Sequence, residues 1–190
     1  MRIIAGEFRG RPLLPPEGDV TRPVTDRVKQ SLFDILAPRV EGSRVYDCFA
    51  GTGSMGLECL SRGAAHATFF EADRSAVTRL KRNIVNLGVT DRSTVVAGDL
   101  FQWCHVTRPG ADRADLVFLD PPYRFLRERP DEVRRLAATL AAHHVASTGI
   151  VVFRHDARDA LDLPPFAPAD RREYGGMALE FLRAVEQLPA

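Results

Sequence analysis

The sequence predicts an α/β protein built on a largely parallel, doubly wound sheet. From residue 44 onward, short apolar segments of strand type alternate with segments of helical periodicity, as a parallel sheet requires. Two of the expected strands end in turn sequences, one rich in glycine and the other containing two prolines. With 190 residues and 45% hydrophobic composition, the chain is long enough to bury a substantial core in one domain.

The first 24 residues differ from the remainder and are expected to form an N-terminal arm. Residues 2–6 and 8–14 have the character of two short extended pieces broken by glycine. Such pieces favour a small β-hairpin. We therefore expect residues 1–24 to be an arm and residues 25–190 to be the main domain.

The main domain is expected to alternate helices and strands. Thr25 or Asp26 can cap a first helix, which Pro38 should end. Gly63 and Gly88 should terminate two later helices. The expected strands are residues 45–49, 67–71, 93–97, 116–119 and 149–153, and the expected helices are residues 54–61, 75–87, a turn after Asp99, and 131–143.

Two consecutive glycines near the C-terminus predict an antiparallel hairpin. Gly175 and Gly176 separate the strand-like residues 172–174 from residues 178–182. An antiparallel pair that finishes a parallel sheet is a feature of Rossmann-like methyltransferases and is uncommon in dinucleotide dehydrogenases. The hairpin therefore favours the first class.

The amino-acid composition indicates a cellular compartment more clearly than it indicates a function. A formal net charge of +1 neither supports nor excludes a nucleic-acid partner, so any basic surface must be local. Cys48, Cys59 and Cys104 form no Cys-x-x-Cys pair and are odd in number, which favours a reducing compartment. The adjacent His143 and His144 diverge on any regular element, and no metal site is predicted. Without a signal-peptide pattern or an apolar run near 18 residues, the expected location is cytoplasmic.

The glycine-rich turn after the first expected strand predicts a cofactor loop. Residues 51–56 satisfy the G-x-G-x-x-G pattern, and Glu71 follows about twenty residues later, as a ribose-binding acid does. This pattern also occurs in NAD-dependent oxidoreductases. Asp47 separates the two classes, because its carboxylate suits the amino group of S-adenosylmethionine and would oppose a pyrophosphate. The alternative is that Gly51 and Gly53 only make a tight turn.

The end of the third expected strand predicts the adenine contacts. Asp99 is placed to accept a hydrogen bond from the adenine amine, and Leu100 or Phe101 can cover the ring. Asp99 could instead cap the short helix that follows it. Both interpretations stay open at the level of sequence.

The tetrad Asp120-Pro121-Pro122-Tyr123 predicts the reaction centre. An exocyclic base amine is a poor nucleophile, because its lone pair is delocalised into the ring. The Asp120 carboxylate and the Pro121 carbonyl can accept its two hydrogens, the prolines stiffen the turn, and Tyr123 offers a stacking face. The target must be flipped out or single-stranded to reach such a centre. By itself, Pro-Pro after a strand is simply a loop; together with the cofactor loop it indicates amine methylation.

These residues resemble one family, the RsmD-type bacterial 16S ribosomal RNA guanine-N2 methyltransferases, which modify guanine 966. The likeness covers residues 2–6, 8–11 and 22–29, Leu32-Phe33, residues 47–53, 56–58 and 60–64, and the 120–123 tetrad, and it fades after about residue 125. The N-terminal block is the specific part, since many amino-methyltransferases share the central motifs.

The resemblance implies a Rossmann-like class I methyltransferase with a seven-stranded, mostly parallel sheet. Its implied donor is S-adenosylmethionine, with S-adenosylhomocysteine as product, and its implied partner is 16S rRNA in the small ribosomal subunit or an assembly intermediate. A monomer without membrane attachment is expected. The rivals are methylation of adenine N6 or cytosine N4 in DNA or another RNA, and a non-catalytic assembly factor.

The resemblance also implies site residues in three groups. Thr25 and Arg27 would close over the methionine end of the donor. The other implied donor-binding residues are Asp47, Phe49, Ala50, Gly51, Gly53, Glu71, Asp99 and Leu100. The implied catalytic residues are Asp120, Pro121, Pro122 and Tyr123, and the implied RNA-binding residues are Arg2, Arg9, Arg11 and Arg22. A solvated charged arm is the alternative for the arginines.

Overall fold

The computed structural model confirms the predicted fold class. It describes residues 1–16, 24–104 and 113–185, in two compact units, Met1–Leu100 and Phe101–Ala190. The sheet has seven strands in the order β3-β2-β1-β4-β5-β7-β6. The sheet is mostly parallel and finishes in the antiparallel hairpin that the paired glycines predict.

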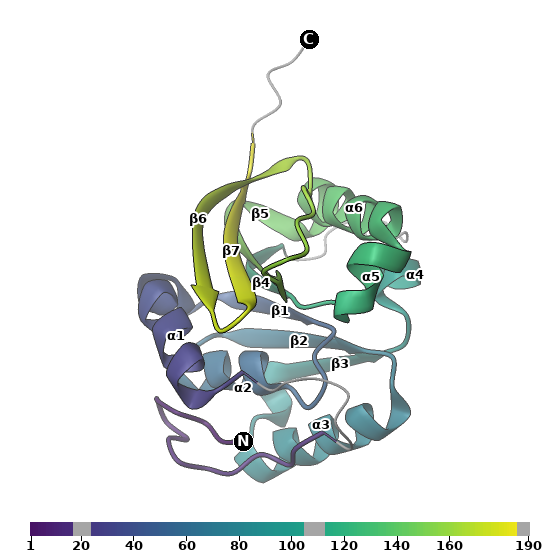
Figure 1. The fold of residues 1–190 in the computed structure, drawn as a ribbon. Coiled ribbons are helices and arrows are strands. Elements are labelled where there is room, and N and C mark those ends of the chain that lie inside the picture. The colour runs from purple at the N-terminus through teal and green to yellow at the C-terminus, as the bar shows by residue number, and fades with distance from the viewer. Residues whose placement is uncertain (17–23, 105–112, 186–190) are drawn as a thin grey trace. The chain divides into compact units, whose positions relative to one another are not determined.

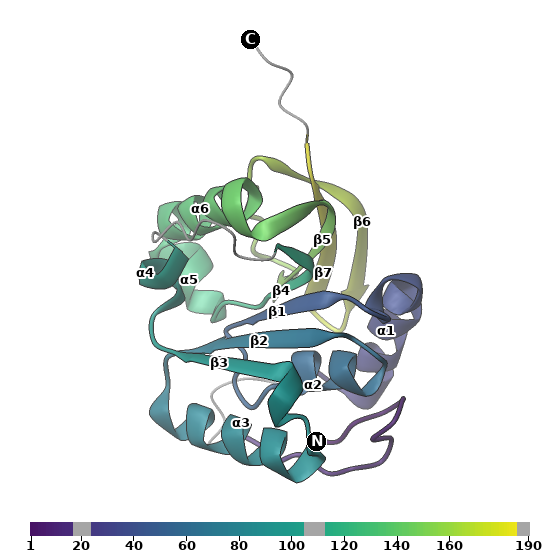
Figure 2. The same cartoon turned by 180° about the vertical axis from the view of Figure 1, so that it is seen from behind.

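The first unit contains three parallel strands with helices packed on them. Its strands are β1 (Arg44–Cys48), β2 (His66–Glu71) and β3 (Ser93–Ala97), and its helices are α1 (Asp26–Val40), α2 (Ser54–Ser61), α3 (Arg74–Leu87) and the 3₁₀ turn η1 (Thr90–Arg92). Strand β2 pairs with β1 on one side and with β3 on the other. Helices α2 and α3 lie on the same side of these strands (Figures 1 and 2). The carboxyl ends of β1 and β2 are followed by turns that lead into α2 and α3.

Helix α1 begins where the sequence predicts but ends later. The Thr25 hydroxyl accepts a hydrogen bond from the Val28 N–H at 3.4 Å, and Thr25 is the N-cap. Pro38 lies inside the last turn, so the prediction that it ends the helix is wrong by two residues. Near a helix end the missing proline N–H removes a single hydrogen bond. Val40, only 1% exposed, keeps the chain helical by packing into the core.

The N-terminal segment folds back on itself and packs on the first unit. Its two extended pieces meet at an isolated antiparallel bridge, Arg2 with Pro12, without regular strands. The Ile3 side chain is fully buried. Leu14 donates its N–H to the Asn83 side chain of α3 at 2.8 Å. Burial of apolar side chains and these backbone contacts fix the segment; its role as a separate RNA-binding arm stays a proposal.

The second unit contains the remaining four strands. They are β4 (Ala114–Leu119), β5 (Val145–Asp156), β6 (Phe166–Tyr174) and β7 (Met177–Ala184), with helices α5 (Tyr123–Glu128), α6 (Pro130–Thr139) and the π-type turn η2 (Leu140–His144). Helix α4 (Leu100–Cys104) spans the boundary of the two units. Strand β4 runs parallel to β5, which pairs antiparallel with β7. In the part of the chain that the structure describes, no helix combines the length and apolar character needed to cross a bilayer.

The second unit departs from the sequence prediction in its helices and in the length of its strands. Helix α5 was not predicted, because the two prolines and the charged residues after them have the character of a loop. Pro122, with φ −48°, supplies its N-cap position. The helix predicted at 131–143 forms as α6 and η2, and β5 is longer at both ends than predicted.

Candidate functional site

The turn after β1 has the strained backbone of a ligand-binding loop. Phe49 is a non-glycine residue at φ 62°, and Gly51 and Gly53 have φ of 56° and 84°. Residues with a Cβ rarely adopt this left-handed region, and the surrounding structure must enforce it. The Ala50 N–H donates to the Phe70 carbonyl of β2 at 2.9 Å, which secures the turn against its neighbouring strand.

The structure brings two predicted donor-binding residues, Glu71 and Gly51, into direct contact. One Glu71 carboxylate oxygen accepts the Gly51 N–H at 2.7 Å. The other accepts the Asp73 N–H at 2.8 Å. Asp73 in turn caps α3, as its acceptance of the Ala76 N–H at 2.8 Å shows. A carboxylate at the end of β2 therefore holds the glycine turn and the start of α3 together.

Asp47 has a structural partner that the sequence did not reveal. Its carboxylate is 3% exposed, and it accepts the Gly56 N–H at 2.8 Å. A Cβ built on Gly56 would lie 2.4 Å from the Phe69 ring and 3.2 Å from the Asp47 carboxylate. Gly56 is thus required for close packing, and Asp47 ties the end of β1 to the first turn of α2.

The space around the turn is open at Gly51 and filled at Gly53. A Cβ built on Gly51 meets no atom within 4 Å, whereas one built on Gly53 would lie 2.4 Å from Leu80 Cδ1. Gly53 is needed for packing, and Gly51 leaves an open approach to the backbone. Asp99 is exposed and Leu100 is 3% exposed, and the Gly98 N–H before them donates to the Glu71 carbonyl at 2.9 Å. This hydrogen bond places Asp99 beside the carboxyl end of β2.

A buried ion pair in the first unit was missed from the sequence. Lys29 Nζ lies 2.9 Å from Glu58 Oε2, with side-chain exposures of 2% and 0%. Glu58 also accepts the N–H groups of Ile4 and Ala5 at 2.9 and 3.0 Å. Burial lowers the pKa of Lys29, and the nearby Glu58 carboxylate opposes that shift. Lys29 also donates to the Ser54 hydroxyl at 3.1 Å, so the pair joins α1, the N-terminal segment and the start of α2.

The predicted RNA-binding arginines have different environments. Arg2 is exposed and pairs with Asp26 at 2.8 Å, next to the predicted donor-closing residues Thr25 and Arg27. Arg9 is exposed on the N-terminal turn. The Arg11 guanidinium donates to the Asn86 carbonyl of α3. Arg22 lies outside the described residues.

The predicted reaction centre lies at the end of β4 in the second unit. Asp120 Oδ1 accepts a hydrogen bond from Arg154 Nε of β5 at 2.7 Å. Pro121 is buried, and Tyr123 begins α5, with its ring centroid 6.0 Å from the Arg154 guanidinium carbon. Burial raises the pKa of Asp120, and the charge and hydrogen bond of Arg154 act in the opposite direction. The tetrad is therefore a rigid corner whose carboxylate is paired with one arginine.

Arg154 is the site residue that the sequence could have indicated. It interrupts the apolar run Ile150–Phe153, and its side chain is 10% exposed. An arginine at a buried strand position needs an anionic partner. Asp120, 34 residues earlier, directly follows β4, the preceding strand of the sheet. Only the pairing of β4 with β5 identifies that partner.

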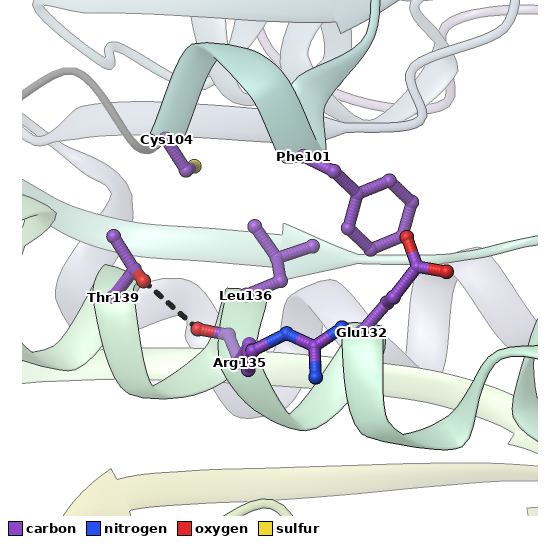
Figure 3. A pocket seen from close by; sticks show the side chains of 6 residues that line it. All are labelled: Phe101, Cys104, Glu132, Arg135, Leu136 and Thr139. Atoms are coloured by element: carbon purple, nitrogen blue, oxygen red, sulfur yellow. Dashed lines mark hydrogen bonds between the residues drawn. The ribbon is translucent and has the colours of Figure 1, made fainter.

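A small cavity elsewhere in the second unit has no evident part in this chemistry (Figure 3). It measures about 30 Å³, room for about one water molecule. Burial raises the pKa of Cys104, which lines it, to about 12, so this thiol is not a thiolate at neutral pH. The other lining residues are Phe101, Glu132, Arg135, Leu136 and Thr139.

Comparison with known proteins identifies the family. The family model described as "Conserved hypothetical protein 95" matches residues 1–183. The chain belongs to this family. The Bacillus subtilis protein YlbH is 34% identical over 157 residues, which are 82% of this chain and 83% of that protein. The E. coli ribosomal RNA small subunit methyltransferase D is 40% identical over 124 residues, 65% of this chain and 61% of that enzyme.

A solved structure extends the match over the whole chain. The E. coli protein yhhF superposes with a TM-score of 0.84 and 32% identity, covering 98% of this chain and 99% of that one. The resemblance to RsmD-type enzymes is therefore confirmed, as are the fold class and the methyltransferase class.

Proposed function

We propose that the protein transfers a methyl group from S-adenosylmethionine to the exocyclic N2 amine of a guanine in 16S rRNA, at the position numbered 966 in bacteria. The observation that carries this proposal is the corner at Asp120, where a partly buried carboxylate paired with Arg154 at 2.7 Å directly follows β4 and precedes two prolines. Membership of a methyltransferase family that includes a small-subunit rRNA enzyme supports the reaction and the substrate class.

The first unit is assigned to the methyl donor, which supplies an activated methyl group when bound. The open approach above Gly51 and the Glu71 carboxylate beside it suit an adenosine ribose. Asp47 shapes the turn, and through that turn it serves the methionine end of the donor. The residues assigned to this half are Thr25, Arg27, Asp47, Phe49, Ala50, Gly51, Gly53, Glu71, Asp99 and Leu100.

The second unit is assigned to the target base. An ionised carboxylate only accepts hydrogen bonds, so Asp120 is suited to hold an amine hydrogen and draw the nitrogen out of conjugation. The Pro121 carbonyl supplies a second acceptor, and Pro122 holds the turn rigid. Tyr123 offers its ring to the base, a stacking contribution of about 1–3 kcal/mol. Positioning and preorganised acceptors supply most of the acceleration, and Asp120 also takes the departing proton.

The substrate is proposed to be rRNA within a small subunit or its assembly intermediate. The arginines assigned to contact its phosphates are Arg2, Arg9, Arg11 and Arg22. Phosphate contacts position the protein along the RNA but do not distinguish one base sequence from another. A protein with a net charge of +1 has little long-range attraction for RNA. Recognition of the shape of a partly assembled subunit is consistent with this low net charge. We further propose that the enzyme acts as a monomer in the cytoplasm.

The test is to map methylation in 16S rRNA from a strain that lacks the gene. We expect one guanine to lose its N2-methyl group and to regain it when the wild-type gene is restored. The Asp120→Ala gene, expressed to the same level, should leave it unmethylated. An unchanged methylation map in the deletion strain rejects the proposed substrate. Incubating the purified protein with labelled donor and isolated small subunits, naked 16S rRNA or DNA then distinguishes the remaining amine substrates.

A further inference from the structure

Arg154 lies against two residues of the tetrad, Asp120 and Tyr123, although it belongs to neither the tetrad nor the glycine loop. Strands β4 and β5 end their parallel ladder with the pair Leu119 and Phe153. Asp120, directly after β4, and Arg154, within β5, are the next residues along the two chain segments, and the ladder places them side by side. The 2.7 Å bond from Arg154 Nε to Asp120 Oδ1 follows from that register.

The arginine is itself held in place by its surroundings. Its side chain is 10% exposed, and its Nη1 lies 3.8 Å from the Met177 sulfur of β7. Its guanidinium carbon lies 6.0 Å from the centroid of the Tyr123 ring on α5. Three elements, β4, β7 and α5, thus contact one side chain from β5. A buried, packed arginine has few alternative rotamers, so it can hold a carboxylate in one orientation.

We propose that Arg154 is a positioning residue for methyl transfer, holding the Asp120 carboxylate through Oδ1 so that Oδ2 faces the target amine. This inference rests on the function proposed above for Asp120. A carboxylate turned by rotation about its χ2 angle would present neither oxygen in line with an amine hydrogen. The charge-assisted bond from Arg154 fixes that rotation.

The same contact keeps the carboxylate in its accepting form. About a quarter of the Asp120 side chain is exposed, and its burial raises its pKa above the usual 3.8. Among the described residues of the second unit, Arg154 is the charged group that acts on Asp120, and it lowers that pKa. Tyr123 and Met177, the other neighbours of Arg154, add no carboxylate or basic side chain. Removing the arginine therefore raises the pKa of Asp120, and the carboxyl becomes protonated at a higher pH.

The test compares wild type, Arg154→Gln and Arg154→Lys in methylation of small subunits across a pH series. We expect Arg154→Gln to lower kcat at neutral pH by roughly tenfold to a hundredfold, as happens when a partner that orients a metal-bound side chain is lost. The acidic limb of its kcat profile should move to higher pH. Arg154→Lys should keep the acidic limb near that of wild type, because it keeps the charge, but should lower kcat because it lacks the planar Nε donor. The KM for S-adenosylmethionine should not change in either variant.

The matched control is Arg158→Gln, in which an arginine 81% exposed and paired with Asp156 at 2.8 Å is lost from the same end of β5. It should match wild type. Binding of S-adenosylhomocysteine and the melting temperature show whether each variant is folded. If Arg154→Gln does not fold, the comparison of Arg154→Lys with wild type tests the proposal. The proposal is overturned if the Arg154 variants keep the wild-type kcat and pH profile.

A double variant separates this inference from the function on which it rests. If Arg154 acts through Asp120, adding Arg154→Gln to Asp120→Asn should change the residual single-turnover rate less than about twofold. A further tenfold loss would show that Arg154 acts independently, and the proposal would be wrong. Full activity in Asp120→Asn alone would instead remove Asp120 from the proposed reaction.

Discussion

Asp47, Glu58 and Glu71 in the first unit are held differently from Asp120 in the second. The first three all accept backbone N–H groups, at distances of 2.7–3.0 Å, and Glu58 is also paired with the side chains of Lys29 and Arg62. Asp120 is held by the side chain of Arg154. Backbone donors tie chain segments together, so Asp47 and Glu71 build the shape of the glycine turn, and Glu58 fixes the N-terminal segment. A single side-chain donor fixes a carboxylate without enclosing it, which suits a group that must bind a substrate.

The turns after β1 and β4 also differ in the backbone conformations that their residues adopt. The turn after β1 has Phe49, Gly51 and Gly53 at positive φ, and Gly51 leaves open space beside the backbone, where we propose that the donor binds. The turn after β4 uses Pro121 and Pro122, which fix φ and remove N–H donors. One turn offers close approach to its backbone, and the other offers rigidity and acceptors. The following predictions test this contrast, from the largest expected effect to the smallest.

Glu58→Ala should have the largest effect on stability. It leaves Lys29 charged and buried and removes the acceptor of the Ile4 and Ala5 N–H groups. Loss of one partner of a buried pair costs about 3–5 kcal/mol. Urea denaturation should therefore show a lower free energy of unfolding by about that amount.

An exposed ion pair provides the control for Glu58. Asp131 pairs with Arg134 at 2.9 Å on α6, with side-chain exposures of 77% and 44%. Asp131→Ala should change the free energy of unfolding by less than about 1 kcal/mol. Equal effects of the two substitutions would show that the Glu58 network does not hold the N-terminal segment, and the contrast between the units would lose its basis.

Asp120→Ala should have the largest effect on activity. We expect methyl transfer to fall by at least about a hundredfold, since a positioned polar group is removed from the reacting centre. The affinity for S-adenosylhomocysteine, assigned to the first unit, should stay near that of wild type. Single-turnover kinetics and calorimetry measure the two quantities. Turnover at the wild-type rate would refute the role of Asp120, and a parallel loss of ligand binding would show that the two halves are not separable.

The sequence predicted the fold well because local signals specified it. The helix at Ser54–Ser61 and the strand at Ser93–Ala97 have the predicted bounds, and the glycine hairpin forms between β6 and β7. These elements depend on periodicity and turn chemistry within a few residues. Helix α5 was missed because a proline pair predicts a loop, although proline also suits the start of a helix.

The sequence predicted the residue types of the site better than their partners. Gly51 and Glu71 were chosen together, and the structure joins them. In contrast, Lys29, the buried partner of Glu58, and Arg154, the partner of Asp120, lie 29 and 34 residues away on other elements. No local pattern encodes such pairs, since the packing of helices and the register of strands create them.

Gly51→Ala should weaken donor binding, whereas a matched glycine substitution elsewhere should weaken only the fold. The new methyl group meets no protein atom within 4 Å, but it occupies the open approach to the turn. We expect the affinity for S-adenosylhomocysteine to fall about tenfold, equivalent to about 1.4 kcal/mol. Gly88→Ala is the matched control, because Gly88 also has a positive φ, 71° against 56°, and open space around it. Both variants should lose about 1–2 kcal/mol of stability through backbone strain, but only Gly51→Ala should lose affinity. Equal affinities would exclude Gly51 from the donor site.

Replacing Arg9 and Arg11 together should have the smallest effect, on RNA affinity. For single-stranded RNA, removing one arginine–phosphate interaction should reduce the slope of log affinity against log salt by roughly 0.7. The double variant should therefore bind 16S rRNA with a flatter salt dependence, measured by filter binding at several salt concentrations. Arg171 and Arg172 on β6, 40% and 54% exposed in their side chains, provide an equal change of charge in the second unit. Their double alanine variant should keep the wild-type slope. If both variants flatten the slope equally, net charge governs RNA binding, and the N-terminal arm has no specific part in the interface.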